Sequence, residues 1–370
     1  MISGLSDFCK KKYILFGPKK YKCPDLNSAL YGILSLIPPI FYVAHWMDEE
    51  FVFQHSLDML FEFLKRQKAY FLYTWFWHID NSQRIEMVKE FEKRHIRKYP
   101  GHQFIHLCNT VEQMEAFQKK RLNAVFCNHN AMVDENIFKP LPFVTKTYDA
   151  IYDAILKDYK RHYLAKDIES LALIYAFNSY IDDINYVNTI KQEFVHARFF
   201  NHPDSSDYIS LEPSEVNQCL NICKVGLCLS SVEGAMYSSI QYLLSGLPVV
   251  STRSLGGRDV FFDEEYVLIV EDKPEAVRKG VRELIGRSIP DHWVRHKTLE
   301  KMRDHRLTLI SLVQGIYNQE GVKRDFASEW DGVFFNKLLR WQSHADTMES
   351  LRQRTTCCPE DSMNGGHRRG

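Results

Sequence analysis

Apolar positions along the chain fall into two kinds of segment, which alternate for most of its length. In one kind, a short run of largely apolar residues stands together, as in residues 69–77, 102–107 and 225–229. In the other kind, apolar residues recur at helical spacing among charged ones, as in residues 82–99. Short apolar runs are typical of buried strands and helical spacing of amphipathic helices, so the alternation predicts α/β layers.

The same two patterns assign most of the remaining chain. Further strands are predicted at residues 13–16, 123–127, 196–200, 249–252 and 266–271, with an apolar run at 171–177. Further helices are predicted at residues 48–68, 110–121, 148–169, 184–192, 213–223, 235–245 and 292–318, with another beginning near residue 274. Thr110 has the side chain of a helix N-cap. The proline-bearing segment 138–142 predicts an inter-domain linker.

One uncharged stretch, residues 29–47, is long enough to span a bilayer. Pro38 and Pro39 stand at its middle, and paired prolines remove backbone hydrogen bonds that lipid cannot replace. We therefore expect a buried helix at residues 28–37, a break, and a buried strand at residues 40–44. Membrane association is expected to be peripheral at most.

Composition narrows the class of protein. The 370 residues include 47 Lys+Arg and 47 Asp+Glu, and this balance gives no electrostatic argument for a nucleic-acid partner. A hydrophobic fraction of 45% is enough for a full core. Nine cysteines without framework spacing, and no secretory signal, favour a cytoplasmic protein with free thiols. Lipidation of Cys357 and Cys358 is the weaker alternative to unmodified thiols. From residue 344 apolar periodicity stops, which predicts a disordered tail at 344–370.

Several familiar motifs are missing from the sequence. It has no G-x-G-x-x-G after a strand, no P-loop and no G-x-S-x-G nucleophile elbow. Two His-x-x-x-His pairs occur. His102 and His106 lie on a predicted strand, whereas His292 and His296 lie on a predicted helix, where two imidazoles could share a metal. The zinc-protease pattern needs Glu after the first histidine, and Trp293 stands there, so we expect surface and core histidines and no metal site.

The most informative block is residues 227–284, where a buried strand leads into a helix through Glu233 and Gly234. The free N–H groups and positive dipole end of a helix start favour an anion, most simply a phosphate. Gln241 follows Glu233 by eight residues, at most ~12 Å along a helix axis. One side chain can then meet a sugar hydroxyl while the other reaches a ribose. The alternative is an ordinary strand–helix turn with a solvated Glu233 and with Gln241 on a wet helix face.

Several pieces of this block occur together and in order, and with them the chain resembles the GT-B glycosyltransferases, most closely the retaining family 4 group. The carboxyl-terminal pieces are Glu233-Gly234, Gly246-Leu247-Pro248-Val249-Val250 and Gly256-Gly257. The upstream pieces are Val125-Phe126-Cys127-Asn128, Val133-Asp134 and Phe138-Lys139-Pro140, followed by Lys160-Arg161-His162. The resemblance covers residues 82–284 and is weaker before them.

Three departures from the family pattern stand out. The second glutamate of the family pair is Gln241 here, and an amide accepts ribose hydroxyls more weakly than a carboxylate but can also donate. The linker has His129 and Asn130 where the family has glycine. The first loop, residues 18–24, lacks the family's Gly-Gly, so acceptor recognition does not transfer.

The resemblance implies roles for residues on the carboxyl-terminal side. Glu233 would hold hydroxyls of the donor sugar, and Gln241 would contact the ribose. Lys160 and Arg161 would neutralise the departing diphosphate; a solvated basic helix face is the alternative for both. The other implied donor-binding groups are the backbone amides of Gly234, Ala235 and Met236, the Gly257 turn, and the Arg258 side chain, for which a surface salt bridge is the alternative.

On the amino-terminal side, His78 ends the aromatic run and resembles the family histidine that approaches the donor sugar. A satisfied core histidine is the alternative, and Asp80 could orient the ring. The resemblance implies catalytic roles for Glu233, His78 and Lys160.

By resemblance, the fold is GT-B, with two Rossmann-like domains that face each other across a cleft. The expected division is residues 1–142 for the acceptor side and 143–343 for the nucleotide-sugar side, including a crossover helical segment near residues 329–341. The implied reaction moves a sugar, hexosyl by analogy, from a nucleotide-diphosphate donor to a hydroxyl acceptor, with retention and without metal or cofactor. The alternatives are a catalytically silent nucleotide- or glycan-binding module and a sugar-nucleotide epimerase.

Overall fold

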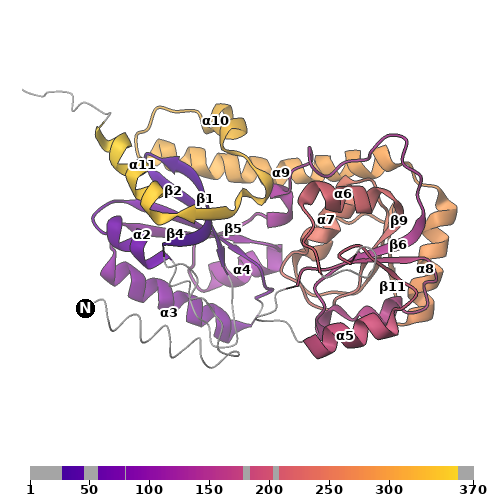
Figure 1. Ribbon diagram of the computed structural model, residues 1–370. Coiled ribbons are helices and arrows are strands. Elements are labelled where there is room, and N and C mark those ends of the chain that lie inside the picture. Colours follow the sequence, from indigo (N-terminus) through magenta and orange to yellow (C-terminus); the bar gives the residue numbers. More distant parts are fainter. Residues whose placement is uncertain (1–26, 46–56, 80, 178–183, 203–207, 357–370) are drawn as a thin grey trace, which may run out of the picture.

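The computed structural model describes residues 27–45, 57–79, 81–177, 184–202 and 208–356 (Figure 1). These residues form two six-stranded sheets that lie side by side in the molecule, each covered by helices. The predicted strand at 13–16, the loop at 18–24, Asp80 and the Cys357–Cys358 pair lie outside the described residues, as does part of the predicted helix at 48–68.

The first sheet, with its helices, forms the amino lobe. Its strand order is β12-β1-β2-β3-β4-β5. Strands β2 to β5 are parallel, whereas β1 is antiparallel to both β2 and β12. The strands are β1 (Ser28–Leu36), β2 (Pro39–His45), β3 (Ala69–Trp75), β4 (His102–Cys108), β5 (Ala124–Phe126) and β12 (Arg340–Ser343). Strand β3 is buried along its whole length, which explains why its sequence is a continuous aromatic and apolar run.

The second sheet, with its helices, forms the carboxyl lobe. Its order is β11-β10-β9-β6-β7-β8, and all its strand pairs are parallel. The strands are β6 (Tyr148–Asp153), β7 (Leu171–Ile174), β8 (Arg198–Phe199), β9 (Cys223–Cys228), β10 (Val249–Thr252) and β11 (Val267–Val270). The first strand of this lobe, β6, lies at the centre and the chain winds outward to both sides. The reversal of strand order between β6 and β9 is the point where doubly wound sheets bind ligands.

Helices connect the strands and join the lobes. They are α2 (Asp58–Phe63), α3 (Ser82–Lys98), α4 (Val111–Lys119), α5 (Ile184–Glu193), α6 (Pro213–Asn221), α7 (Tyr237–Leu244), α8 (Pro274–Arg287), α9 (Asp291–Gln319), α10 (Phe326–Val333) and α11 (His344–Thr356). Short 3₁₀ turns are η2 (His129–Met132), η3 (Asp158–Lys160), η4 (His162–Ala165), η6 (Gly257–Asp259) and η7 (Asn336–Leu338). Thr110 caps α4 as predicted, because its Oγ1 accepts a hydrogen bond from the Gln113 amide at 3.1 Å.

Helix α9 is the main brace between the lobes. Its 29 residues give a length of about 43 Å, and Figure 1 shows it running along both lobes. Arg295 donates to the carbonyls of Leu244 in α7 and of Phe138 in the segment between β5 and β6. Arg306 forms a two-bonded ion pair with Glu135 in the same segment. The helix thereby fixes the segment through which the chain passes from one sheet to the other.

Three sequence predictions of secondary structure are wrong. Residues 28–36 form strand β1 rather than a helix, because β2 pairs with residues 31–36 and β12, more than 300 residues later in the chain, pairs with residues 28–31. Residues 148–169 contain strand β6 followed by 3₁₀ turns. Residues 344–356 form helix α11, so the disordered tail predicted from residue 344 is wrong for these residues. Strand β12, at the end of the expected 143–343 division, pairs with β1 of the amino lobe. Among the described residues no helix is long and apolar enough to cross a membrane.

Candidate functional site

The site lies at the reversal of strand order between β6 and β9. After β6 ends at Asp153, the chain makes the turn η3, which carries Lys160. After β9 ends at Cys228, residues 229–236 form an irregular connection that carries Glu233 and leads into α7. Because carboxyl ends of neighbouring parallel strands meet at one sheet edge, residues 73 positions apart converge there.

Lys160 and Glu233 form an ion pair at this edge. Both side chains are buried, with 9% and 8% of their surfaces exposed. The Lys160 backbone carbonyl accepts a hydrogen bond from the Tyr152 hydroxyl at 2.6 Å, which fixes the turn onto β6. The Lys160 ammonium also lies 5.3 Å from the centre of the Tyr159 ring. A buried pair of this kind holds a carboxylate and an ammonium in fixed positions, ready for exchange with a polar ligand.

The start of α7 has no side-chain cap. Its N-cap is Met236, whose side chain makes no capping hydrogen bond. The first N–H groups of a helix have no intrahelical acceptor, and a methionine cannot supply the oxygen that Ser, Thr, Asn or Asp would bring. The uncapped start therefore leaves the positive end of the helix dipole beside the Lys160–Glu233 pair.

Gln241 lies in the second turn of α7 and is 6% exposed, so it does not lie on a wet helix face. All residues of α7 after Ser238 are buried. The helix begins at Tyr237, four residues after Glu233, so the two predicted donor contacts flank its first turn. The structure places Glu233 before the first turn of α7 and Gln241 just after that turn.

Arg161 is engaged by the framework of the carboxyl lobe. It adopts a left-handed backbone conformation with φ 53°. Its guanidinium donates to the Leu229 carbonyl at 2.6 Å and to the Thr252 hydroxyl at 2.7 Å, and it pairs with Asp272 at 2.6 Å. These bonds tie η3 to the ends of β9 and β10. The contacts favour a structural role for Arg161 over the predicted role at the diphosphate.

Arg258 is fully buried, and its guanidinium is bonded to the strand ends around it, which favours a structural role over the predicted phosphate contact. Its Nη1 donates to the Ser230 carbonyl at 2.6 Å, and its Nη2 donates to the Ser251 hydroxyl at 2.7 Å and the Thr252 carbonyl at 2.5 Å. Its Nε pairs with Asp259 at 2.7 Å. The guanidinium therefore satisfies backbone carbonyls at the carboxyl ends of β9 and β10. Of the three predicted basic residues, Lys160 is the one that directly contacts Glu233.

Three glycines let the lobes approach at this edge. A Cβ on Gly234 would come within 2.4 Å of the Phe76 carbonyl oxygen, at the end of β3. A Cβ on Gly257 would come within 2.5 Å of the Asn109 Cβ, just beyond β4. Gly256 has φ +99°, and a Cβ there would meet the Glu233 carbonyl oxygen at 1.7 Å. These positions need glycine for close backbone approach.

The amino lobe meets the site through a polar edge that sequence reasoning did not assign. The Asn128 amide donates to the Gly257 carbonyl at 2.7 Å, and the Asn130 amide donates to the Met236 carbonyl at 3.0 Å. The ring of His129 hydrogen-bonds the Ala235 carbonyl at 3.2 Å, and burial lowers the pKa of His129 to about 3. His129 and Asn130 are the residues at which the linker departs from the family pattern. This departure from the family pattern was the signal in the sequence that could have marked the two residues as contacts between the lobes.

His78 lies beside the Gly256 turn, because a Cβ on Gly256 would lie 3.1 Å from the His78 Cβ. The preceding residue, Trp77, contacts the Tyr159 ring in the carboxyl lobe at 5.3 Å between centroids. The end of β3 therefore reaches across to both η3 and the glycine turn. The structure places His78, half-buried, at the interlobe edge.

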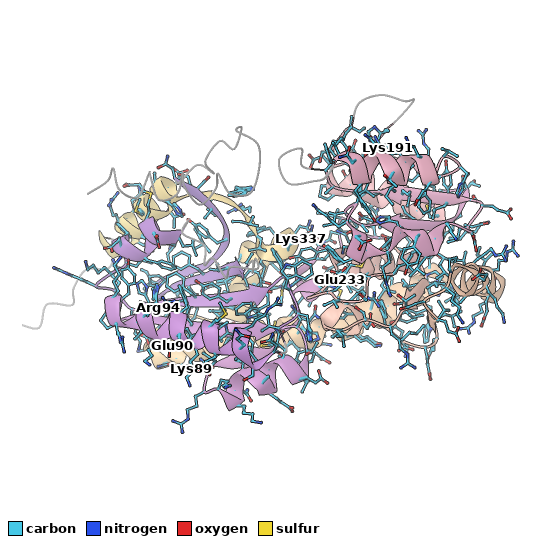
Figure 2. All side chains as sticks on the ribbon, turned by 90° about the horizontal axis from the view of Figure 1, so that it is seen from below. Lys89, Glu90, Arg94, Lys191, Glu233 and Lys337 are labelled. Atoms are coloured by element: carbon cyan, nitrogen blue, oxygen red, sulfur yellow. The ribbon has the colours of Figure 1, made fainter. Side chains whose placement is uncertain are left out.

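Two charged residues at this edge have no counterpart in the sequence predictions. Asp153 ends β6, and burial raises its pKa to about 6. Lys337 comes from η7, near the end of the chain, and its ammonium lies 4.4 Å from the centre of the Tyr237 ring. Figure 2 shows Lys337 and Glu233 in the region between the two lobes. No local pattern marks Lys337 in the sequence.

A hollow of about 990 Å³ adjoins the site on the side of β10 and β11. Its lining combines the exposed side chains of Leu255, Ile269 and Arg253 with Ser254 and Lys273. The Leu255 carbonyl accepts a hydrogen bond from the Glu233 amide at 2.9 Å, so the hollow begins one residue from the glycine turn. Space for a second molecule thus lies next to the Glu233 loop.

The histidine pairs considered as metal ligands have other partners. The His102 ring hydrogen-bonds the His95 ring at 2.9 Å, and His106 contacts Glu92 at 2.5 Å. His296 lies 3.3 Å from Glu300 on α9. Within the part of the chain that the structure describes, no group of three or more His, Cys, Asp or Glu side chains is arranged to hold a metal ion.

Comparison with known proteins gives structural but not sequence matches. No protein-family model matches the sequence, and no curated protein matches it either. Among solved structures, HepE from Anabaena in complex with UDP and glucose has a TM-score of 0.51 and 11% identity, with 71% of this chain and 76% of HepE covered. Sucrose-phosphate synthase from Thermosynechococcus elongatus has a TM-score of 0.51 and 13% identity, with 76% of this chain and 74% of the synthase covered. A glycosyltransferase from Rickettsia africae has a TM-score of 0.50 and 14% identity, with 76% of this chain and 77% of the other covered.

These similarities concern the fold, since the identities are low. The two sheets face each other with the carboxyl ends of their parallel strands, as the bonds from Asn128 to the Gly257 turn and from Asn130 to the start of α7 show. The fold is GT-B, with two Rossmann-like lobes, as the resemblance predicted.

Proposed function

We propose that this protein is a glycosyltransferase that moves a sugar from a nucleoside-diphosphate-sugar to a hydroxyl group. The observation that carries the proposal is the buried Lys160–Glu233 pair at the reversal of strand order, beside the uncapped start of α7. The carboxylate matches the hydroxyls of such a donor, and the ammonium and the positive end of the helix dipole match its diphosphate.

The chemistry follows from these groups. Glu233 accepts hydrogen bonds from sugar hydroxyls and thereby orients the anomeric carbon toward the amino lobe. The acceptor oxygen bonds to the anomeric carbon as the bond from that carbon to the distal phosphate oxygen breaks, and the acceptor proton passes to the departing phosphate. The Lys160 ammonium shifts from Glu233 toward that phosphate and stabilises its negative charge. Retention at the anomeric carbon and independence from metal are part of the proposal, since an ammonium and a helix start can supply the leaving-group stabilisation.

The position of His78 supports a role in orienting the donor sugar from the amino lobe. Its backbone belongs to the segment that contacts Gly256 and, through Trp77, the turn that carries Lys160. The adjoining hollow beside Leu255 offers room for the acceptor. The structure of HepE contains UDP and glucose, so a UDP-sugar is the first donor to test.

A thermal-shift panel of UDP-, GDP-, ADP- and CMP-sugars tests the proposal. A bound ligand at a hundred times its dissociation constant should stabilise the protein by about 2.7 kcal/mol. We expect stabilisation by one diphosphate sugar and slow release of its sugar to water. Absence of stabilisation by every nucleotide sugar would contradict the proposal.

The second candidate is a nucleotide-sugar-binding module without turnover. The observation that favours it is the engagement of Arg161 and Arg258 by the framework, which leaves fewer cations for leaving-group stabilisation. Isothermal titration that detects a donor, combined with no sugar release to water or to a broad set of hydroxyl acceptors, would favour the module.

A further inference from the structure

The turn η7 carries a strained backbone in the segment that joins α10 to β12. Lys337 has φ 66° and ψ 0°, and Leu338 follows with φ 53°. Side chains other than glycine, asparagine and aspartate rarely adopt the left-handed region, and two such residues in succession persist only where the surroundings hold them. Strain of this kind commonly marks a functional position.

The surroundings do hold this turn in place. The Asn336 side chain accepts a hydrogen bond from the Asp134 amide at 3.1 Å, which links the turn to the residues after η2. Leu338 is fully buried, and its carbonyl oxygen would lie 2.2 Å from a Cβ on Gly32 in β1. The absence of a side chain at Gly32 therefore lets the turn press onto the amino-lobe sheet. Lys337, between these two anchors, is aimed at the interlobe edge.

The Lys337 ammonium lies over the ring of Tyr237, the first residue of α7, at 4.4 Å from its centre. Lys337 makes no hydrogen bond or ion pair with another described residue. Burial lowers its pKa, while the charge of Asp153 at the end of β6 opposes that change. Lys337 is thus a partly desolvated cation that contacts an aromatic face and lies near Asp153 without pairing with it, and such a cation is prepared to receive an anion.

The charges already at the edge leave a role for such a cation. A diphosphate needs more positive charge than Lys160 supplies, because Lys160 already contacts Glu233. Arg161 donates hydrogen bonds to Leu229, Thr252 and Asp272, and Arg258 is fully buried between the ends of β9 and β10. Both guanidinium groups are therefore already occupied by the protein. Asp153 adds a negative charge close to both Lys160 and Lys337. Lys337 is the further cation that reaches the start of α7 in the described part of the chain.

We propose that Lys337 is the second cation of the donor site and binds the diphosphate together with Lys160 and the start of α7. The inference rests on the proposed function and deepens it. It makes the crossover turn η7 part of the site. A segment that returns from the carboxyl lobe to the amino lobe would then sense the donor directly.

The test compares Lys337→Asn with Lys337→Arg. Asparagine removes the charge but tolerates the left-handed backbone, so the turn is preserved, and arginine restores the charge. Lys297→Met is the matched control, because the Lys297 ammonium lies 4.9 Å from the centre of the Trp293 ring on α9, far along the chain from the site. Isothermal titration measures the affinity for UDP, GDP and ADP and for uridine, guanosine and adenosine.

We expect Lys337→Asn to weaken binding of the preferred nucleoside diphosphate at least tenfold, with less than a threefold change for the matching nucleoside. Lys337→Arg should recover most of the affinity, and Lys297→Met should match the unmodified protein. Equal diphosphate affinity in Lys337→Asn and the unmodified protein would overturn the role of Lys337 and leave the proposed function standing. Failure of the unmodified protein to bind any of the diphosphates would overturn both.

Discussion

Lys160 and Glu233 lie 73 positions apart in the sequence, yet their side chains form a buried ion pair where strands β6 and β9 end. The pair has two separable functions in this account. It stabilises the fold, and it supplies the two charges that a sugar diphosphate would engage. Substitutions can distinguish the two functions, because stability and turnover respond differently to loss of one partner and to loss of both.

Glu233→Gln should abolish sugar transfer and also destabilise the protein. An ammonium that loses its buried partner costs about 3–5 kcal/mol, whereas replacing both partners by apolar groups is often nearly neutral. The double variant Lys160→Met/Glu233→Leu should therefore recover most of the lost stability in urea unfolding while staying inactive. Wild-type turnover in Glu233→Gln would remove Glu233 from the mechanism.

Arg258→Lys should lower the free energy of unfolding by roughly 3 kcal/mol or more, because a lysine cannot replace the forked hydrogen bonds to Ser230, Ser251 and Thr252. Under native conditions, its affinity for the donor nucleotide should stay within about threefold of the unmodified protein's. Urea unfolding and isothermal titration measure the two quantities. A stable Arg258→Lys variant that no longer binds nucleotide would show that Arg258 contacts the phosphate after all.

Gly234→Ala should separate the lobes. Its Cβ would meet the Phe76 carbonyl oxygen at 2.4 Å, so the amino lobe must move away. We expect a larger radius of gyration in small-angle X-ray scattering and a loss of turnover of at least tenfold. Gly286→Ala on α8 is the control, since nothing lies within 4 Å of its added Cβ, and alanine should stabilise that helix by up to about 1 kcal/mol. Identical scattering from both variants would refute the close approach.

Asp153 predicts a pH dependence of stability. Burial raises its pKa from 3.8 to about 6, so the folded state holds this proton more tightly than the unfolded state. Ionisation of Asp153 therefore lowers the free energy of unfolding as the pH rises from about 4 to about 6, by at most about 3 kcal/mol. The variant Asp153→Asn has no carboxyl group at this position to ionise, so its free energy of unfolding does not fall for this reason.

Urea unfolding of both proteins at pH 4, 5, 6 and 7 measures the effect. The stability of Asp153→Asn relative to the unmodified protein should increase across this range. Burial also lowers the pKa of His129 to about 3, so protonation of this histidine lowers the free energy of unfolding as the pH falls. This effect is the same in both proteins. A constant difference across the range would mean that Asp153 is solvated.

The sequence predicted the local structure around Glu233, because neighbouring residues determine it. Glu233 and Gly234 stand at a strand–helix junction, and the strand, junction and helix all occur where the pattern places them. Strand β10 has the predicted bounds, because four buried β-branched and small residues lie between Pro248 and a polar loop. These features depend on neighbours in sequence, so a sequence pattern can predict them.

Features that depend on distant partners were not predictable. Strand β12 pairs with residues 28–31 of β1, and nothing near residue 30 indicates that partner, whereas β2 pairs with residues 31–36. Helix α11 packs through a few contacts, such as the Thr347 hydroxyl with the Tyr31 hydroxyl at 2.8 Å, rather than through an apolar stripe. The burial of Arg258 and the arrival of Lys337 at the start of α7 likewise follow from the tertiary arrangement.

The most direct test is a crystal structure with the preferred nucleoside-diphosphate-sugar bound. The account predicts the diphosphate at the start of α7, within hydrogen-bond distance of the Tyr237 or Ser238 amide and of the Lys160 ammonium, and a sugar hydroxyl on the Glu233 carboxylate. A donor bound elsewhere, with the Lys160–Glu233 pair intact and no ligand at that helix start, would contradict it.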